Sequence, residues 1–259
     1  MRREEYRNNE IEDEGIICGR NPVFEALKAE RNIEKILIAD GSREGLILKI
    51  IAMAREKGIP VVTTRRESLD KMFTTKSHQG IAAYVTQKEY STVEEILDYA
   101  YSKNQKPFLV IADEISDPHN LGAIIRSADC AGAHGVIIQK RRSCGMTSTV
   151  YKSSAGAAEH MKIARVTNLN DTVRSLKKAG VFVFGTDGMG DRYYYDTDYD
   201  CPVAIVIGSE GEGMSRLMRE SCDMLLKIPM FGKINSLNAS CAAAIVLMEC
   251  AKFRSLKNI

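Results

Sequence analysis

Short apolar runs alternate with amphipathic stretches along the first part of the chain, after a polar start. Residues 1–14 are rich in charge and hold little to bury, so we expect a polar arm there. Asn21 suits the N-cap of a helix, and Pro22 suits its first helical position. Further segments have strand or helix patterns: strands at 34–40, 59–64 and 80–85, and helices at 46–57 and 68–73. Together they predict a small α/β unit over residues 15–87.

The second part of the chain repeats this alternation more regularly. Apolar runs predict strands at 108–112, 135–139, 181–186, 203–208 and 224–228. Helical periodicity falls at 121–132, 168–180, 214–221 and 238–254. Buried strands that alternate with helices are typical of a mainly parallel sheet covered on both faces. We therefore predict an α/β domain over 107–259, joined to the first unit by a polar, partly helical linker at 88–106.

Composition narrows the class of protein only a little. Hydrophobic residues make up 44% and charged residues 27%, with a net charge of +2, so no basic tail announces a nucleic-acid binder. Seven scattered cysteines without a C-x-x-C pair favour a reducing compartment and argue against a zinc site. No apolar stretch resembles a secretion signal or a membrane span. We expect a cytoplasmic protein without a metal.

Three segments of the second domain concentrate unusual residues, each after a predicted strand, where ligands bind in open α/β sheets. The first is ADEISDPHNLGAIIRSADCAGA (112–133). Residues 117–120 are of types that favour a turn, and Asn120 is a candidate cap for a helix that carries Arg126. A plain capped helix with a solvated arginine would show the same residue types.

The second segment is VAIVIGSEGEGMS (203–215), a buried strand that runs into three glycines around Glu210. The glycine order is G-x-x-G-x-G, which is not the dinucleotide fingerprint, and GTDGMG (185–190) repeats that order. A nucleotide-like ligand and an ordinary strand-to-helix turn both fit this pattern. A nicotinamide oxidoreductase is disfavoured.

The third segment is KIPMFGKINSLNASCAAAIVLMECAKF (227–253). Ser236-Leu237-Asn238 leads into a helix rich in alanine, which allows a close approach to a neighbouring element or a ligand. An asparagine-capped packing helix would look the same.

Taken together, DPHNLGAIIRSA, VIGSEGEGM and IPMFGKINSLNAS resemble the three motifs of the SpoU/TrmH family of RNA ribose methyltransferases, within the SPOUT superfamily. GRNPVFEAL (19–27) and HQGIAAYV (78–85) resemble the N-terminal RNA-binding domain of its ribosomal-RNA members. The resemblance implies a knotted parallel-sheet methyltransferase domain, with the trefoil knot near the C-terminus, after a small ribosomal-protein-like α/β domain. It also implies a homodimer with the active site near the subunit interface.

The same resemblance implies roles for individual residues. The catalytic set is Arg126, Asn120, Glu210, Ser236 and Asn238. The pocket for S-adenosylmethionine (AdoMet) comprises Thr186, Gly188, Ile207, Gly208, Gly211, Ile228, Met230, Ser236 and Leu237. Two roles stay open for Arg126: a base that takes the proton of the hydroxyl, or a cation that clamps an RNA phosphate.

Candidate RNA contacts are Arg20, His78, Gln79, His119, Lys140, Arg141 and Arg142, and each could equally be an ordinary solvated side chain. The expected substrate is a guanosine of large-subunit ribosomal RNA. A transfer-RNA 2′-O-methyltransferase is the alternative within the enzyme class. A non-catalytic RNA-binding or ribosome-assembly protein of the same fold is the alternative outside it.

Overall fold

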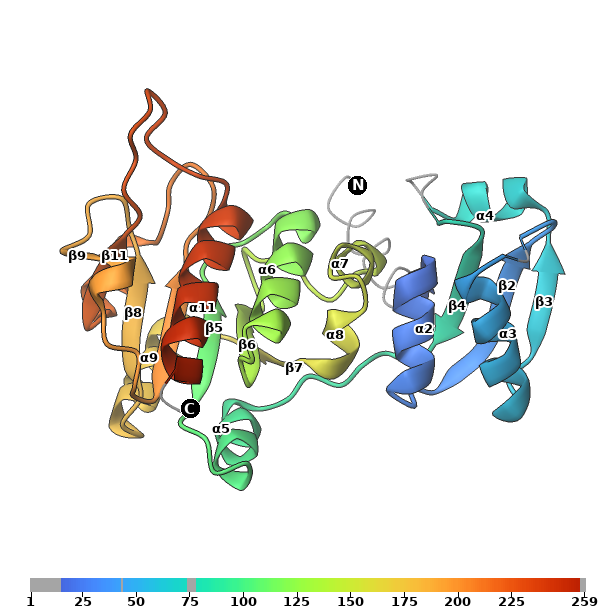
Figure 1. The fold of residues 1–259 in the computed structure, drawn as a ribbon, viewed down its shortest axis with the longest axis horizontal. Helices are drawn as coiled ribbons and strands as arrows, with labels where there is room; N and C mark the ends of the chain where they lie inside the picture. Colours follow the sequence, from blue (N-terminus) through green and yellow to red (C-terminus); the bar gives the residue numbers. More distant parts are fainter. Residues whose placement is uncertain (1–14, 43, 74–77, 257–259) are drawn as a thin grey trace. The chain divides into compact units, whose positions relative to one another are not determined.

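The computed structural model describes residues 15–42, 44–73 and 78–256, which form two compact units (Figure 1). The first unit contains residues up to Glu89 together with 146–160, and the second contains 90–145 and 161 onward. The polar arm predicted at 1–14 lies outside the described residues. The segment 146–160, expected in the methyltransferase domain, packs with the N-terminal residues. The expected linker is also part of a folded unit, because its helix α5 (Val93–Ser102) buries Ile96 in the core of the second unit.

The first unit is a four-stranded sheet with the order β1-β4-β2-β3. Its strands are β1 (Ile16–Cys18), β2 (Ile33–Ala39), β3 (Val61–Thr64) and β4 (Ile81–Val85). Its helices are α2 (Arg20–Lys28), α3 (Leu46–Glu56), α4 (Arg66–Met72), α7 (Ser148–Ser153) and α8 (Ala157–His160). β4 lies antiparallel to β1 and β2, whereas β2 and β3 are parallel. The expected cap is wrong: α2 begins at Arg20 after Gly19, so Asn21 lies inside the helix.

The second unit contains a seven-stranded sheet with the order β7-β6-β5-β10-β8-β11-β9, in which every neighbouring pair is parallel. The strands are β5 (Phe108–Ala112), β6 (Gly135–Gln139), β7 (Lys162–Val166), β8 (Phe182–Thr186), β9 (Arg192–Tyr193), β10 (Val203–Ile207) and β11 (Met224–Lys227). The parallel sheet predicted from the apolar runs is confirmed. β7 and β9 were not predicted, since β7 includes Lys162 and Arg165 and β9 has two residues.

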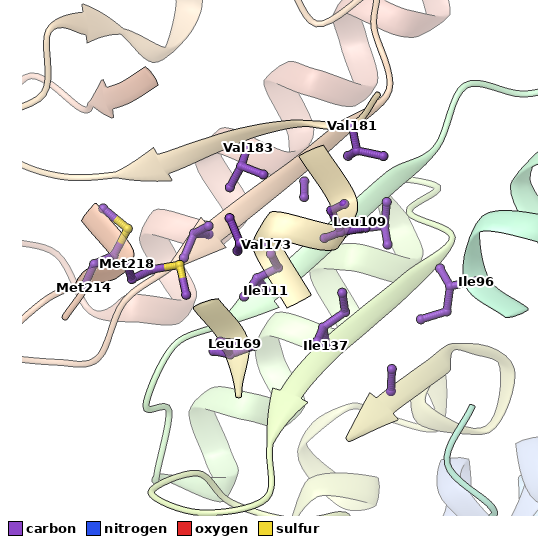
Figure 2. Close-up of a cluster of buried hydrophobic side chains, with 14 residues drawn as sticks. Ile96, Leu109, Ile111, Ile137, Leu169, Val173, Val181, Val183, Met214 and Met218 are labelled. Atoms are coloured by element: carbon purple, nitrogen blue, oxygen red, sulfur yellow. The ribbon is translucent and has the colours of Figure 1, made fainter. Parts of the chain in front are cut away.

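Helices cover this sheet in two layers. α5, α9 (Leu169–Lys178) and α10 (Arg216–Ser221) bury Ile96, Val173 and Met218 in one apolar cluster against the central strands (Figure 2). α6 (Pro118–Cys130) and α11 (Ala239–Leu256) pack side by side (Figure 1). A 3-10 turn, η1 (Tyr194–Asp196), follows β9. All strands of the sheet end along one edge, and the three segments singled out above follow β5, β10 and β11 there.

Candidate functional site

A cavity of about 360 Å³ opens beside the carboxyl ends of β8, β10 and β11. All nine side chains or glycines expected to hold AdoMet line it: Thr186, Gly188, Ile207, Gly208, Gly211, Ile228, Met230, Ser236 and Leu237. Glu210 of the expected catalytic set lines it as well. Parallel strands that share a sheet edge bring these residues together although they span 52 positions of the chain, from Thr186 to Leu237.

The glycines after β10 build a tight turn at the cavity. The Ser209 N–H donates to the Gly213 carbonyl at 3.0 Å, and the Gly213 N–H donates back to the Ser209 carbonyl at 3.0 Å. Gly211 and Gly213 have φ values of 87° and 71°, which glycine adopts without the strain other residues meet. A Cβ on Gly208 would lie 2.3 Å from the Met214 nitrogen. The glycines are therefore required by the backbone of this turn, which positions Glu210.

The segment after β8 forms another wall of the cavity. The Thr186 hydroxyl donates to the Val206 carbonyl at 3.0 Å, which ties the end of β8 to β10. Asp187 is nearly buried and pairs with Arg219 of α10 at 2.8 Å. Asp187 and Arg219 both line the cavity, together with Asn235. These three were not among the expected residues, although Asp187 lies inside the GTDG sequence that was singled out.

Asn238 connects the three motif segments. Its side-chain amide donates to the Asn120 side-chain oxygen at 3.0 Å and to the Glu210 carboxylate. Its own oxygen accepts from the backbone N–H groups of Ser240 and Cys241 at 2.9 and 3.3 Å. Asn238 therefore caps α11, and the same side chain orients Asn120 and Glu210.

Two expectations about α6 change. Its cap is Asp117, whose side chain accepts from the His119 N–H at 2.9 Å, so Asn120 lies within the first turn and is free to bond Asn238. Arg126 is exposed on the same helix and makes no hydrogen bond or ion pair with the described residues. It does not line the cavity at the ends of β8, β10 and β11, which we call the AdoMet-type cavity. A single chain therefore brings together Asn120, Glu210 and Asn238, but not Arg126.

In the first unit, two of the candidate RNA contacts, Arg20 and Gln79, lie in contact with each other. The Arg20 N–H donates to the Gln79 side-chain oxygen at 3.0 Å, and both residues line a cavity of about 460 Å³ with Arg66, which sequence reasoning missed. The structure corrects the prediction that His78 contacts RNA. It is fully buried, bonds Asp70 at 3.0 Å through Nε2, and accepts from the Gly80 N–H at 3.0 Å through Nδ1. Its ring holds the turn together and offers no surface to RNA.

The candidate RNA contacts of the second unit follow β5 and β6. His119, Lys140 and Arg141 are exposed, as an RNA contact requires. Arg142 is also exposed, but it pairs with Glu114 at 3.1 Å. These positions share the sheet edge of the cavity, because β5 and β6 are parallel to β10.

Burial determines the behaviour of several titratable groups of the second unit. Asp113, at the end of β5, is buried, and burial raises the pKa of its carboxyl although the Ser215 N–H donates to it at 2.9 Å. Burial likewise raises the thiol pKa of Cys222 and of Cys250 to about 12, so neither thiol is a nucleophile at neutral pH. Asp113 has a structural role: by accepting from the N–H of Ser215, the N-cap residue of α10, its carboxyl fixes the start of that helix.

Within the described ranges, no group of three or more His, Cys, Asp or Glu side chains is arranged to hold a metal ion. The same residues contain no helix with the length and apolar character that crossing a membrane requires.

Comparison with known proteins assigns the family. The model of the SpoU rRNA methylase family matches residues 107–248, and a model described as RNA 2′-O ribose methyltransferase substrate binding matches residues 16–91. The putative TrmH-family tRNA/rRNA methyltransferase YacO of Bacillus subtilis is 44% identical over 239 residues, which cover 92% of this chain and 96% of that protein. A putative TrmH-family relative from Staphylococcus saprophyticus is 41% identical and covers 94% and 97% of the two chains.

Solved structures agree with this assignment. The SpoU methyltransferase AviRb from Streptomyces viridochromogenes, in complex with AdoMet, superposes with a TM-score of 0.76 at 26% identity, covering 93% of this chain and 90% of that one. An AdoMet-bound rRNA methyltransferase from Sinorhizobium meliloti gives 0.74 at 25% identity, with 92% and 86% covered. By its sequence, its two matched domains and its fold, the chain belongs to the SpoU/TrmH family of RNA methyltransferases.

Proposed function

We propose that this protein transfers a methyl group from AdoMet to a ribose 2′-hydroxyl of RNA. The observation that carries the proposal is the single cavity lined by all nine expected cofactor residues and bordered by the Asn120–Asn238–Glu210 network. The family assignment and the AdoMet-bound relatives support the same reaction.

The cavity fits AdoMet in size and chemistry. Its volume of about 360 Å³ is within the range of small-molecule pockets, which combine apolar walls with a few polar groups. Ile207, Leu226 and Ile228 offer apolar surface for an adenine ring, while the glycine turn exposes backbone groups. Asp187 adds one carboxylate. AdoMet, when bound, supplies an electrophilic methyl group on a sulfonium centre.

The residues of this chain would align the accepting oxygen and remove its proton. Holding two reactants in line can lower a barrier by about 7–11 kcal/mol. Asn238 fixes the carboxylate of Glu210 and the amide of Asn120 at the cavity. Arg126 has two possible roles: its guanidinium could clamp an RNA phosphate, or it could take the proton of the hydroxyl as a base. In both roles Arg126 is essential.

We further propose a homodimer in which Arg126 completes the site near the subunit interface. Arg126 is exposed and has no hydrogen bond or ion pair with any described residue. It also does not line the cavity that it would serve. The segment between β11 and α11 projects from the unit (Figure 1), and its Phe231 and Ile234 are 96% and 73% exposed. Large exposed apolar side chains beside an active site are typical of a protein interface. Analytical ultracentrifugation tests this proposal, and a monomer at micromolar concentration would contradict it.

The finer proposal for the substrate is a guanosine in large-subunit ribosomal RNA. The match of residues 16–91 to a substrate-binding domain supports an RNA substrate that the protein contacts at more than the methylated nucleotide. Transfer RNA remains the alternative substrate, since relatives bear names that include both. A non-catalytic RNA-binding role is less well supported, because Asn120, Glu210, Ser236 and Asn238 are all present at the cavity or its border.

The decisive experiment supplies labelled AdoMet with ribosomal or transfer RNA from cells that lack the gene. Label in large-subunit ribosomal RNA that is lost with Arg126→Ala supports the whole proposal. Label confined to transfer RNA rejects the substrate but keeps the reaction. Arg126→Lys keeps the charge and loses the guanidinium fork, so near-normal turnover of this variant would reject both roles of Arg126.

A further inference from the structure

We propose that a second cavity of the catalytic unit binds an unpaired nucleotide of the RNA substrate, a short distance along the strand from the nucleotide that is methylated. This inference rests on the proposed function. The cavity measures about 790 Å³ and lies at the carboxyl ends of β6 and β7. It is lined by residues from the start of α5, from both strand ends and from α9: Tyr90, Ser91, Thr92, Val93, Glu94, Lys140, Arg165, Val166, Asp171, Thr172 and Ser175.

Arg165 is the residue that points to a ligand. Its Nε is buried and has no hydrogen-bond partner among the described residues, and its guanidinium lies 5.4 Å from the centre of the Tyr90 ring. A buried donor left without an acceptor is costly, so native structures rarely retain one without a reason. A guanidinium with an unused Nε offers the two-pronged donor set that matches a phosphate. A phosphate oxygen would satisfy this atom.

The remaining lining fits a nucleotide better than a bare anion. Lys140 adds a second cation, but Glu94 and Asp171 add two carboxylates, so the charges of the lining cancel. Asp171 also pairs with Arg174 at 3.0 Å. Carboxylates repel an inorganic anion, yet they accept from the exocyclic amino groups of bases. Tyr90, Val93 and Val166 provide aromatic and apolar surface for an unstacked base, which is how single-stranded RNA is recognised.

The position of the cavity lets one RNA strand reach both sites. All strands between β7 and β10 are parallel, so the two cavities open at the same edge of the sheet. β7 lies three strand spacings from β10 in the order β7-β6-β5-β10, and each spacing is about 4.8 Å, which gives about 14 Å. A nucleotide held by Arg165 and Lys140 at this separation would fix the register of the strand at the methylation site.

The test uses the full-length protein and a short single-stranded RNA that contains the methylated nucleotide. Arg165→Lys keeps the charge but loses the fork, and Lys140→Ala changes an exposed side chain, which guards against a folding defect. We expect each variant to bind this RNA about tenfold more weakly and to raise KM, with kcat at saturating RNA and the AdoMet Kd unchanged. Lys178→Ala, an exposed cation of α9 that does not line the cavity, is the matched control.

The outcomes separate this inference from the proposed function. If the wild-type protein methylates the RNA, and Arg165→Lys and Lys140→Ala behave as Lys178→Ala does, the second cavity is not a nucleotide site. If both variants lose affinity for RNA and Lys178→Ala does not, the inference is supported. Guanosine monophosphate tests whether the bound nucleotide belongs to the substrate RNA. If this free nucleotide binds the cavity and RNA does not compete with it, the assignment to substrate RNA is overturned. A wild-type protein that binds neither AdoMet nor RNA would reject the proposed function itself.

Discussion

The side-chain amide nitrogen of Asn238 lies 3.0 Å from the side-chain oxygen of Asn120, a residue 118 positions earlier in the chain. The same nitrogen donates to Glu210, while the Asn238 oxygen caps α11. Both ends of one amide are therefore in use, one for the fold and one for the site. A substitution that changes only the donor end separates the two roles.

Asn238→Asp is the substitution that makes this separation. Aspartate caps a helix as well as asparagine does, so the melting temperature should change little. The variant has no N–H to offer Asn120, and it places a second carboxylate against Glu210. We expect methyl transfer to RNA to fall by about 10²-fold or more, as on loss of a preorganised polar group. Ser240→Ala, which removes only a hydroxyl bonded to the Asn238 oxygen at 2.6 Å, is the control. Equal activity of the two variants would argue against the network.

Gly208 and Gly188 should respond differently to alanine. A Cβ on Gly208 would meet the Met214 nitrogen at 2.3 Å and the Gly213 carbonyl carbon at 2.4 Å, whereas a Cβ on Gly188 meets nothing within 4 Å. We expect Gly208→Ala to destabilise the protein by about 1–3 kcal/mol and to weaken AdoMet binding. Gly188→Ala should leave stability within about 0.5 kcal/mol. Thermal unfolding and calorimetric titration measure both effects, and a stable Gly208→Ala variant would contradict the tight turn.

The ion pair between Arg31 and Glu159 links residues 146–160 to the N-terminal part of the first unit. The two side chains are 7% and 1% exposed, and the Arg31 Nη1 lies 2.7 Å from the Glu159 Oε1. Arg31→Ala leaves a buried carboxylate without its cation, which typically costs about 3–5 kcal/mol. We expect lower urea stability and faster proteolysis within 146–160. Lys28→Ala, which breaks an exposed pair with Glu25, should cost less than about 1 kcal/mol. Similar losses in both variants would contradict the buried pair.

His134 should make stability depend on pH. Its ring is buried, and burial, with repulsion from Arg254 and Lys103, lowers its pKa from 6.5 to about 4. The unfolded chain therefore binds a proton at this histidine at higher pH than the folded chain does. The stability that the neutral ring contributes is present above about pH 6.5 and is lost as the pH falls toward 4, by up to about 3 kcal/mol. Urea unfolding of His134→Gln should show a flatter profile in this window. His160→Gln, at an exposed histidine, is the control.

Much of the molecule follows from local sequence. The apolar runs that become β5 and β10 are buried along their whole length, so their composition predicts parallel strands directly. The motif residues around Gly208 and Asn238 follow strands of one parallel sheet, and this topology brings their loops to one edge. The nine expected AdoMet residues and Glu210 were implied by the resemblance of these motifs to the SpoU/TrmH family, whereas Asp187, Arg219 and Asn235 were identified only by the tertiary structure.

Other features depend on which segments meet in space. The sequence could not show that His78 turns inward to Asp70, that Asp117 rather than Asn120 caps α6, or that 146–160 joins the first unit. It also could not show that Tyr90 and Arg165 share a cavity with Lys140. The sequence by itself determined the family, the parallel sheet and the cofactor loops, because those are encoded in local patterns. The tertiary structure decided partners and burial, because these depend on contacts between residues that lie far apart in the chain.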